Sequence, residues 1–349
     1  MFRSVCAVLA LVVGGLVSSV ASPAWACGCG AYIPNRSGAS VVDERALIAW
    51  DGTAEDILMS FDVAGSSDTA AWVMPAPSAA QVSLGDAQVF DQLGRLTSPR
   101  VEYRDAWWPT FTWLFPSRTA PDTAGAPSGG AVNVLGSQRI GPFDVTRLAA
   151  DDPAALAKWL ADKGFPHPEG LDQNLAPYLA DRWEIVAIQL APAEDRGSLT
   201  GGLQPLRLSF RSDTVVYPMR LSRAATTPQY VDLYVLADHR MDPTTVPVAG
   251  QKPTLEFAGH LDSDLAAPLA GYVGEGAFLT RWSDRIYDPA SIDGDYVFER
   301  AASDTPYQQV IYRTRNHGDV MGLILLAVLA SAVVVVVVVL ARRARKVSA

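Results

Sequence analysis

Residues 45–61 have the sequence RALIAWDGTAEDILMSF, which predicts a β-hairpin. Residues 46–50 are apolar, and between 57 and 61 apolar side chains alternate, as in a half-buried strand. Asp51-Gly52 lies between the two runs, and an Asp-Gly pair favours a tight hairpin turn because glycine accepts positive φ. We therefore expect two adjacent antiparallel strands here.

The residues that follow the hairpin predict further strands and short helices. A third strand is expected over 70–74, and it ends at Pro75-Ala76-Pro77 because proline cannot continue a central ladder. Trp72 in this strand is expected in the core, with an exposed aromatic–proline platform for a ligand as the alternative. Helices are predicted over 85–96, over 153–163 after Asp152 and before Gly164, and over 171–181.

Three period-2 runs occupy 206–211, 215–221 and 231–235, and they predict three successive strands of an antiparallel meander. Together with the earlier elements they indicate an α+β fold with mostly antiparallel sheets and a few short helices.

The C-terminal region predicts one transmembrane helix. Residues 321–341 carry no charge, and about 20 apolar residues are enough to cross the hydrocarbon core of a bilayer. Basic residues follow at once and mark the cytoplasmic side. We expect the span at 320–341 and a basic cytoplasmic tail at 342–349.

The N-terminal region predicts a secretory signal peptide. Arg3 precedes an apolar stretch over 5–20, and Ala24-Trp25-Ala26 fits the small-x-small cleavage rule. Cleavage after residue 26 leaves an extracytoplasmic domain at 27–319 with its N-terminus outside the cell. An uncleaved anchor and a lipoprotein signal are the alternatives.

The composition excludes two classes of protein. Hydrophobic residues make up 49% of the 349, which is too many for a disordered chain. Removing Arg3 and the four basic tail residues from the net charge of −9 leaves −14 for the exported part, which argues against a nucleic-acid partner. A Ser/Pro/Gly-rich stretch at 117–130 marks a candidate boundary within the domain. Arginine far outnumbers lysine, which is typical of a GC-rich bacterial genome and so points to a bacterial plasma membrane.

Two cysteines remain after signal cleavage, Cys27 and Cys29, separated by Gly28. An even pair in an oxidising compartment favours a disulfide. Lipidation of Cys27, a metal or redox role, and free thiols are the alternatives.

No established catalytic or cofactor pattern is present. The sequence contains no serine-hydrolase elbow, zinc-protease helix, P-loop or dinucleotide motif, and its four histidines lack metal-ligand spacing. An acidic stretch between Asp288 and Glu299 suits a solvated loop, with a calcium site as the alternative, although its spacing differs from an EF-hand. We assign no catalytic, cofactor-binding or metal-binding residue.

Tryptophans cluster at Trp107, Trp108 and Trp113. Such residues pack in cores, but they also form binding faces and membrane-interface belts. We treat these three as a candidate binding surface, with a core position as the alternative.

Several short motifs occur in an order that resembles the bacterial domain-of-unknown-function family 2330. The resemblance runs from about residue 27 to about residue 237 and implies an exported, often membrane-anchored protein, with no activity or catalytic residues attached. The matching pieces are CGCG at 27–30, RALIAWDG at 45–52, AWVMPAP at 71–77, FDQL at 90–93, KWL at 158–160, Pro177-Tyr178, WEIVAIQL at 183–190, LQPLRLSF at 203–210 and VVYPMRL at 215–221.

These observations lead to a non-enzymatic, membrane-tethered exported domain that binds an envelope component or a protein partner. One alternative is an envelope hydrolase or a thiol-redox enzyme that uses Cys27 and Cys29. The other is a ligand-sensing subunit of a membrane complex.

Overall fold

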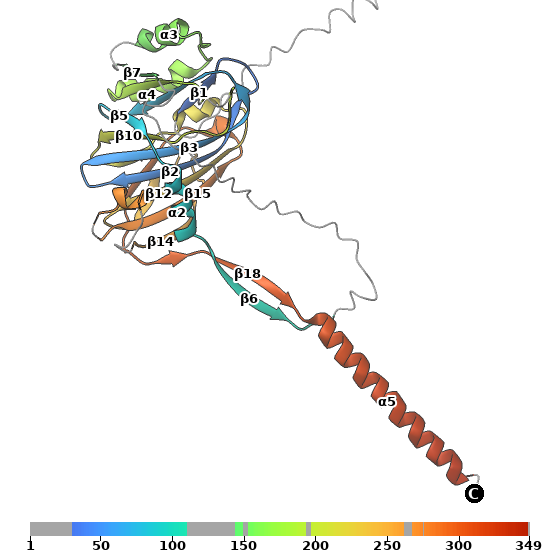
Figure 1. Ribbon diagram of the computed structural model, residues 1–349. Helices are drawn as coiled ribbons and strands as arrows, with labels where there is room; N and C mark the ends of the chain where they lie inside the picture. Colours follow the sequence, from blue (N-terminus) through green and yellow to red (C-terminus); the bar gives the residue numbers. More distant parts are fainter. Residues whose placement is uncertain are drawn as a thin grey trace, which may run out of the picture. The chain divides into compact units, whose positions relative to one another are not determined.

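The structure is a computed structural model, and the chain divides into two compact units (Figure 1). The first unit comprises Met1–Ser98 and Ser137–Gln308, and the second comprises Pro99–Gly136 and Gln309–Ala349. Residues described by the structure are 30–109, 144–148, 153–192, 197–261, 267–274 and 276–347.

A nine-stranded sheet forms the centre of the first unit. Eight strands run in the order β17-β14-β15-β12-β2-β3-β10-β5, and β9 also pairs with β3. The predicted hairpin is confirmed, since β2 and β3 are antiparallel and Gly52 has a φ of 95°. The strand bounds are β2 Ser40–Trp50, β3 Ala54–Ser67, β5 Gln81–Leu84, β9 Leu199–Gly202, β10 Leu206–Arg211, β12 Gln229–Ala237, β14 Thr254–His260, β15 Phe278–Ile286 and β17 Tyr307–Gln308.

A second, four-stranded sheet packs on the first, in the order β1-β4-β8-β7. Every residue of β4 is buried, and Trp72 has no exposed surface. Its ring lies 5.6 Å from that of Phe61 in β3, in the core between the two sheets. The predicted core position of Trp72 is therefore confirmed. The bounds are β1 Ala31–Pro34, β4 Ala70–Ala76, β7 Asp144–Leu148 and β8 Glu184–Leu190.

Helices cover the outer faces of both sheets. Helix α2 (Gln88–Leu96) and the 3-10 helix η2 (Leu269–Tyr272) pack on the large sheet. Helices α3 (Pro153–Asp162) and α4 (Leu171–Ala180) pack on the smaller sheet. The three predicted helices are thus confirmed, and Gly164 ends α3 with a φ of 77°.

The predicted meander is wrong. Strand β10 pairs with β3 and β5, β11 (Val215–Tyr217) pairs with β16 (Tyr296–Arg300), and β12 pairs with β15 and, in parallel, with β2. Alternation identifies which face of a strand is buried, but it does not identify the neighbouring strand. The small third sheet, β11-β16-β13 with β13 at Met241–Thr245, adds to the same core.

The second unit contains two parallel strands and the C-terminal helix. β6 (Arg100–Ala106) pairs with β18 (Val310–Asn316) over seven residues, and α5 (Gly318–Val347) follows β18. The segment Gly318–Arg345 is long and apolar enough to cross a membrane, and its apolar window is not buried against the protein. The predicted α+β class, with mostly antiparallel sheets and an apolar C-terminal helix, is confirmed.

Glu55 is an acidic side chain inside the core of the first unit. Glu55 in β3 has no exposed surface, and one of its carboxyl oxygens accepts a hydrogen bond of 3.2 Å from the Val216 amide. The other oxygen has no partner among the residues that the structure describes. Burial raises the pKa of Glu55 well above its ordinary value, because desolvation penalises the charged form.

We expect Glu55→Gln to stabilise the protein at neutral pH by about 1 to 3 kcal/mol. In the unfolded chain Glu55 ionises near its ordinary pKa, whereas the folded form keeps its proton to higher pH. Stability is therefore full below the unfolded pKa and falls as the pH rises toward the folded pKa.

The measurement is chemical denaturation of the full chain in detergent between pH 4 and pH 8, with the exposed Glu299→Gln as the matched control. Glutamine resembles the protonated acid, so Glu55→Gln should flatten the pH dependence. An equal pH dependence in the two variants would contradict an ionisation of Glu55 that is suppressed by folding.

Candidate functional site

A small polar pocket lies in the first unit, where α4, the 3-10 helix η1 (Arg220–Ala224) and the loop before β16 meet. Its volume is about 160 Å³. The loop follows a third 3-10 helix, η3 (Pro289–Ser291). The lining residues are Gln173, Asn174, Pro177, Arg220, Arg223, Ile292 and Asp293.

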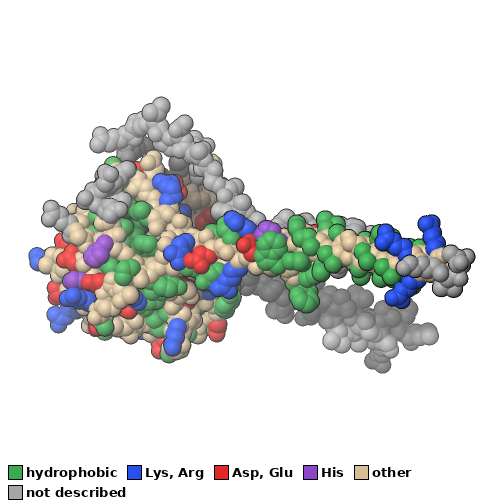
Figure 2. Space-filling model, turned by 90° about the horizontal axis from the view of Figure 1, so that it is seen from below, with side chains coloured by type: hydrophobic (Ala, Val, Ile, Leu, Met, Phe, Trp, Pro, Cys, Tyr) green, Lys and Arg blue, Asp and Glu red, His purple; other side chains and the backbone are tan. Residues whose placement is uncertain are grey.

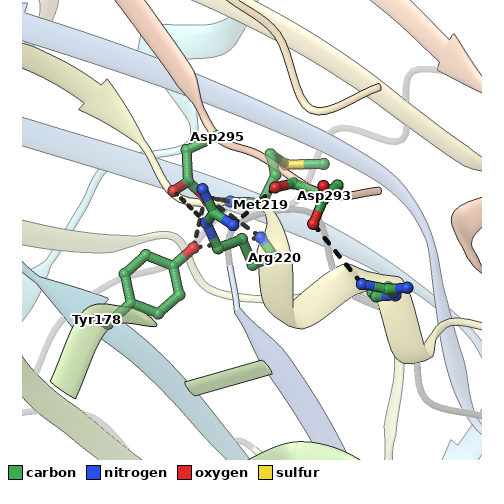
Figure 3. Close-up of polar contacts among 6 residues, drawn as sticks. Tyr178, Met219, Arg220, Asp293 and Asp295 are labelled. Atoms are coloured by element: carbon green, nitrogen blue, oxygen red, sulfur yellow. Dashed lines mark hydrogen bonds and ion pairs between the residues drawn. The ribbon is translucent and has the colours of Figure 1, made fainter. Parts of the chain in front are cut away.

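Asp295 joins the elements around this pocket (Figure 3). One of its oxygens accepts hydrogen bonds from the Tyr178 hydroxyl at 2.5 Å, the Met219 amide at 2.7 Å and the Arg220 amide at 3.3 Å. The other oxygen accepts from Arg220 Nε at 3.1 Å. Because the Asp295 side chain is only 13% exposed, these donors replace most of its water. It therefore holds α4, η1 and the start of β16 together.

Tyr178 acts as a hydrogen-bond donor in this network. Its pKa is raised, first by burial and then by the negative charge of Asp295. The phenol therefore keeps its proton at physiological pH and continues to donate to Asp295. This environment suits a structural donor and does not suit a general base.

Two guanidinium groups border the pocket. Arg220 is held by Asp295 and by the Asp293 carbonyl oxygen, to which Nη1 donates at 2.7 Å. Arg223 lies farther out, 48% exposed, with its Nη1 3.8 Å from the Asp293 carboxylate. The side-chain amides of Gln173 and Asn174 line the same pocket.

These donors can bind an acidic group, because guanidinium and amide N–H groups match the lone pairs of a carboxylate. Asp293 contributes the one carboxylate among the seven lining residues, which include no serine, cysteine, lysine or histidine.

Removing the Asp295 carboxylate should destabilise the first unit strongly. We expect Asp295→Ala to lower the free energy of unfolding by about 2 to 3 kcal/mol, because the hydroxyl, two amides and the guanidinium lose their shared acceptor. Chemical denaturation followed by circular dichroism measures the effect. Asp293→Ala is the matched control, since that side chain is 85% exposed and Arg220 binds its backbone oxygen. Equal losses in both variants would show that Asp295 does not organise the site.

The structure describes only two of the residues predicted as site candidates. Trp107 and Trp108 lie in the second unit and are 50% and 83% exposed, so a core position is wrong for both. Cys27, Cys29 and Trp113 lie outside the described residues, as do residues 1–26 and 117–130, and the predictions for them stay predictions.

The acidic stretch between Asp288 and Glu299 has local structural roles. The Asp288 side chain caps η3 by accepting from the Ala290 amide at 3.2 Å, and Asp295 binds Arg220 and Tyr178. In the part of the chain that the structure describes, no three His, Cys, Asp or Glu side chains are placed to share a metal ion. Asp295 is therefore a buried partner and not one of a set of solvated loop carboxylates.

Sequence reasoning missed Tyr178, Arg220 and Asp295 as a group. They come from a helix, a 3-10 turn and the start of a strand, separated by 42 and 75 residues. Tyr178 and Arg220 fall within motifs quoted for the family resemblance, but neither motif has a spacing that indicates chemistry. Only the packing of α4 against η1 brings them together.

Among the solved structures to which the chain is similar is one of low similarity. The crystal structure of baculovirus P35 is 8% identical, with 78% of this chain and 98% of that chain covered, at a TM-score of 0.31. No curated protein matches the chain.

The family comparison covers most of the fold described above. A family described as an uncharacterized protein conserved in bacteria, DUF2330, matches residues 23–299. This range includes the four-stranded sheet, the nine-stranded sheet apart from β17, the pocket and the Asp295 network. It confirms the resemblance found in the motifs. The chain therefore belongs to the bacterial family DUF2330.

Proposed function

We propose that this protein is a single-pass membrane protein whose exported domain binds an envelope component or a protein partner. The proposed membrane anchor is α5. The observation that supports it is that the valines from Val333 to Val339 are all exposed on this helix. Exposed valines in such a run are unfavourable in water and favourable in lipid.

The proposed orientation places the domain outside the cell. Residues 1–26 act as a cleaved signal, 27–319 form the extracytoplasmic part with a boundary near 117–130, and 320–341 span the plasma membrane. The short tail at 342–349 stays in the cytoplasm, because Arg342, Arg343, Arg345 and Lys346 follow the rule for cytoplasmic flanks.

We place the binding function in the pocket beside Arg220 and Arg223. Two guanidinium groups and two amides offer hydrogen-bond donors to an acidic ligand. The one carboxylate of the lining, Asp293, is paired with Arg223 at 3.8 Å. The ligand class is a small molecule or side chain that carries a carboxylate.

Reporter fusions test the orientation. Green fluorescent protein fused after residue 349 should fluoresce, since it folds in the cytoplasm, and alkaline phosphatase at the same place should be inactive. External protease added to spheroplasts should degrade the domain and leave the C-terminal reporter. An active phosphatase at the C-terminus would overturn the orientation.

Titration with succinate, a simple dicarboxylate, tests the pocket. Succinate should raise the melting temperature of the full chain in detergent. Arg223→Gln should weaken succinate binding about tenfold, because one charge-assisted hydrogen bond is lost. Arg95→Gln, an exposed arginine on α2, is the matched control and should bind as the natural chain does. An equal response in all three chains would contradict the assignment of the pocket.

A further inference from the structure

We infer that Trp107 and Trp108 lie in the lipid interface at the outer end of α5. Through them the ribbon formed by β6 and β18 meets the membrane. We expect the two indole side chains to contact lipid at the boundary between headgroups and acyl chains. The inference rests on the proposed membrane span and adds an interaction surface to it.

Contacts within the second unit tie Trp107 to the start of the span. Its ring stacks on that of His317, with 4.4 Å between centroids and 19° between planes. His317 Nε2 lies 3.0 Å from the Asp105 carboxylate, and the His317 amide donates to the Ala106 carbonyl at 2.8 Å. The Met321 amide then donates to the His317 carbonyl at 3.1 Å, which closes the first turn of α5. Trp107, with Trp108 next to it in the chain, is therefore held close to the first turn of α5.

The length of the span puts this junction at the right depth. Residues 321–341 rise about 30 Å at 1.5 Å per residue, which equals the thickness of the hydrocarbon core. Arg342 begins the opposite flank. When the basic flank lies at the inner surface, residue 321 lies at the outer edge of the hydrocarbon, and the tryptophans lie in the adjoining headgroup region.

The exposure of the two indoles fits this environment. Trp108 is 83% exposed and Trp107 is 50% exposed, which is costly for large apolar groups in water. An indole has an apolar ring and one N–H donor, and it prefers a layer where the ring meets acyl chains and the donor stays hydrated. Figure 2 shows hydrophobic side chains along α5 and Lys and Arg side chains toward its far end.

The ribbon beyond the pair presents groups that suit phospholipid headgroups. Arg104 lies over the Tyr312 ring at 3.5 Å, and Arg315 lies over the Tyr103 ring at 4.0 Å. Stacking orients these guanidinium groups while leaving them able to bind phosphate oxygens. The positive charges of Arg104 and Arg315 are therefore compatible with an anionic bilayer surface.

Quenching by brominated lipid tests the inference on the full chain. The chain is reconstituted in phosphatidylcholine–phosphatidylglycerol vesicles in which the phosphatidylcholine acyl chains are brominated, and tryptophan emission is compared with that in unbrominated vesicles. The quantity measured is the tryptophan emission that is lost in brominated vesicles. We expect this loss to be at least about twofold smaller in the double variant Trp107→Phe/Trp108→Phe, because interfacial tryptophans lie within reach of the bromines. Trp113 is retained in every chain, so the difference reports on the replaced pair.

Trp282→Phe is the matched control. This indole belongs to the first unit, where its Nε1 donates to the Met241 carbonyl at 3.0 Å. Its removal should leave the emission lost to bromine quenching unchanged. The single Trp108→Phe variant guards against misfolding, since its side chain is almost fully exposed, and it should lose part of the quenching.

Flotation of the vesicles separates the two ways to fail. A chain that does not float with lipid contradicts the membrane span and with it the proposed function. A chain that floats, but shows equal quenching with and without Trp107 and Trp108, overturns the interface inference and leaves the span intact. In that case the exposed pair is free for a protein partner.

Discussion

A chain that ends at His317 is expected to leave the membrane completely and to collect in the soluble extracytoplasmic fraction. The full chain should remain in the pellet after a carbonate wash. The reason is that α5 contains an apolar window long enough to cross a bilayer, and in the proposed topology its transfer to lipid supplies the tether. Valine and leucine each favour insertion by about 0.3 to 0.6 kcal/mol at the centre of a span, and the many such residues between 321 and 341 act together.

A chain that ends at Arg345 is the matched control, because it keeps the whole candidate span and most of the basic flank. It should stay in the pellet. If the chain that ends at His317 also resists carbonate, a second tether exists, and the lipidation alternative at Cys27 becomes the explanation to test by intact mass.

Trp72→Ala is expected to lower the free energy of unfolding by about 3 to 5 kcal/mol, the usual cost of truncating a buried aromatic residue. Trp72 has no exposed surface and lies between the nine-stranded and the four-stranded sheet, so the cavity would open at the centre of the core. Whole-domain stabilities are about 5 to 15 kcal/mol, so the loss removes a large fraction. Denaturant titration followed by circular dichroism measures it.

Two further variants sharpen this test. Trp72→Phe should cost only about 1 kcal/mol, because it also removes an indole N–H that has no partner in the described part of the core. Trp108→Ala should change stability by less than about 0.5 kcal/mol, since that side chain is exposed. Similar losses for Trp72→Ala and Trp108→Ala would contradict the core position.

Local sequence signals predicted the elements but not their partners. The Asp51-Gly52 turn, the three short helices and the apolar C-terminal helix depend on neighbouring residues, and the structure confirms each of them. The pairing of β12 with β2 and of β6 with β18 joins segments about 190 and 210 residues apart. Nothing in the alternation of a strand names such a partner.

The candidate site also shows that local sequence signals do not identify tertiary partners. Asp295 was expected in a solvated acidic loop, because its neighbours Asp288 and Asp293 are acidic and glycine precedes it. In the fold, α4 and η1 exclude most of the water around Asp295 and supply its donors. Burial and hydrogen bonding thus depend on segments that the local pattern does not contain.

By itself, the sequence determined the family, the α+β class, the buried strand around Trp72 and the apolar C-terminal helix, since each depends on composition or on residues close in the chain. Only the tertiary structure decided the strand order, the Tyr178–Asp295–Arg220 network, the buried Glu55 carboxyl and the stack of Trp107 on His317. The physical reason is that hydrophobic burial is non-directional: it selects which side chains go inside, whereas the neighbours they meet depend on how the whole chain closes its core.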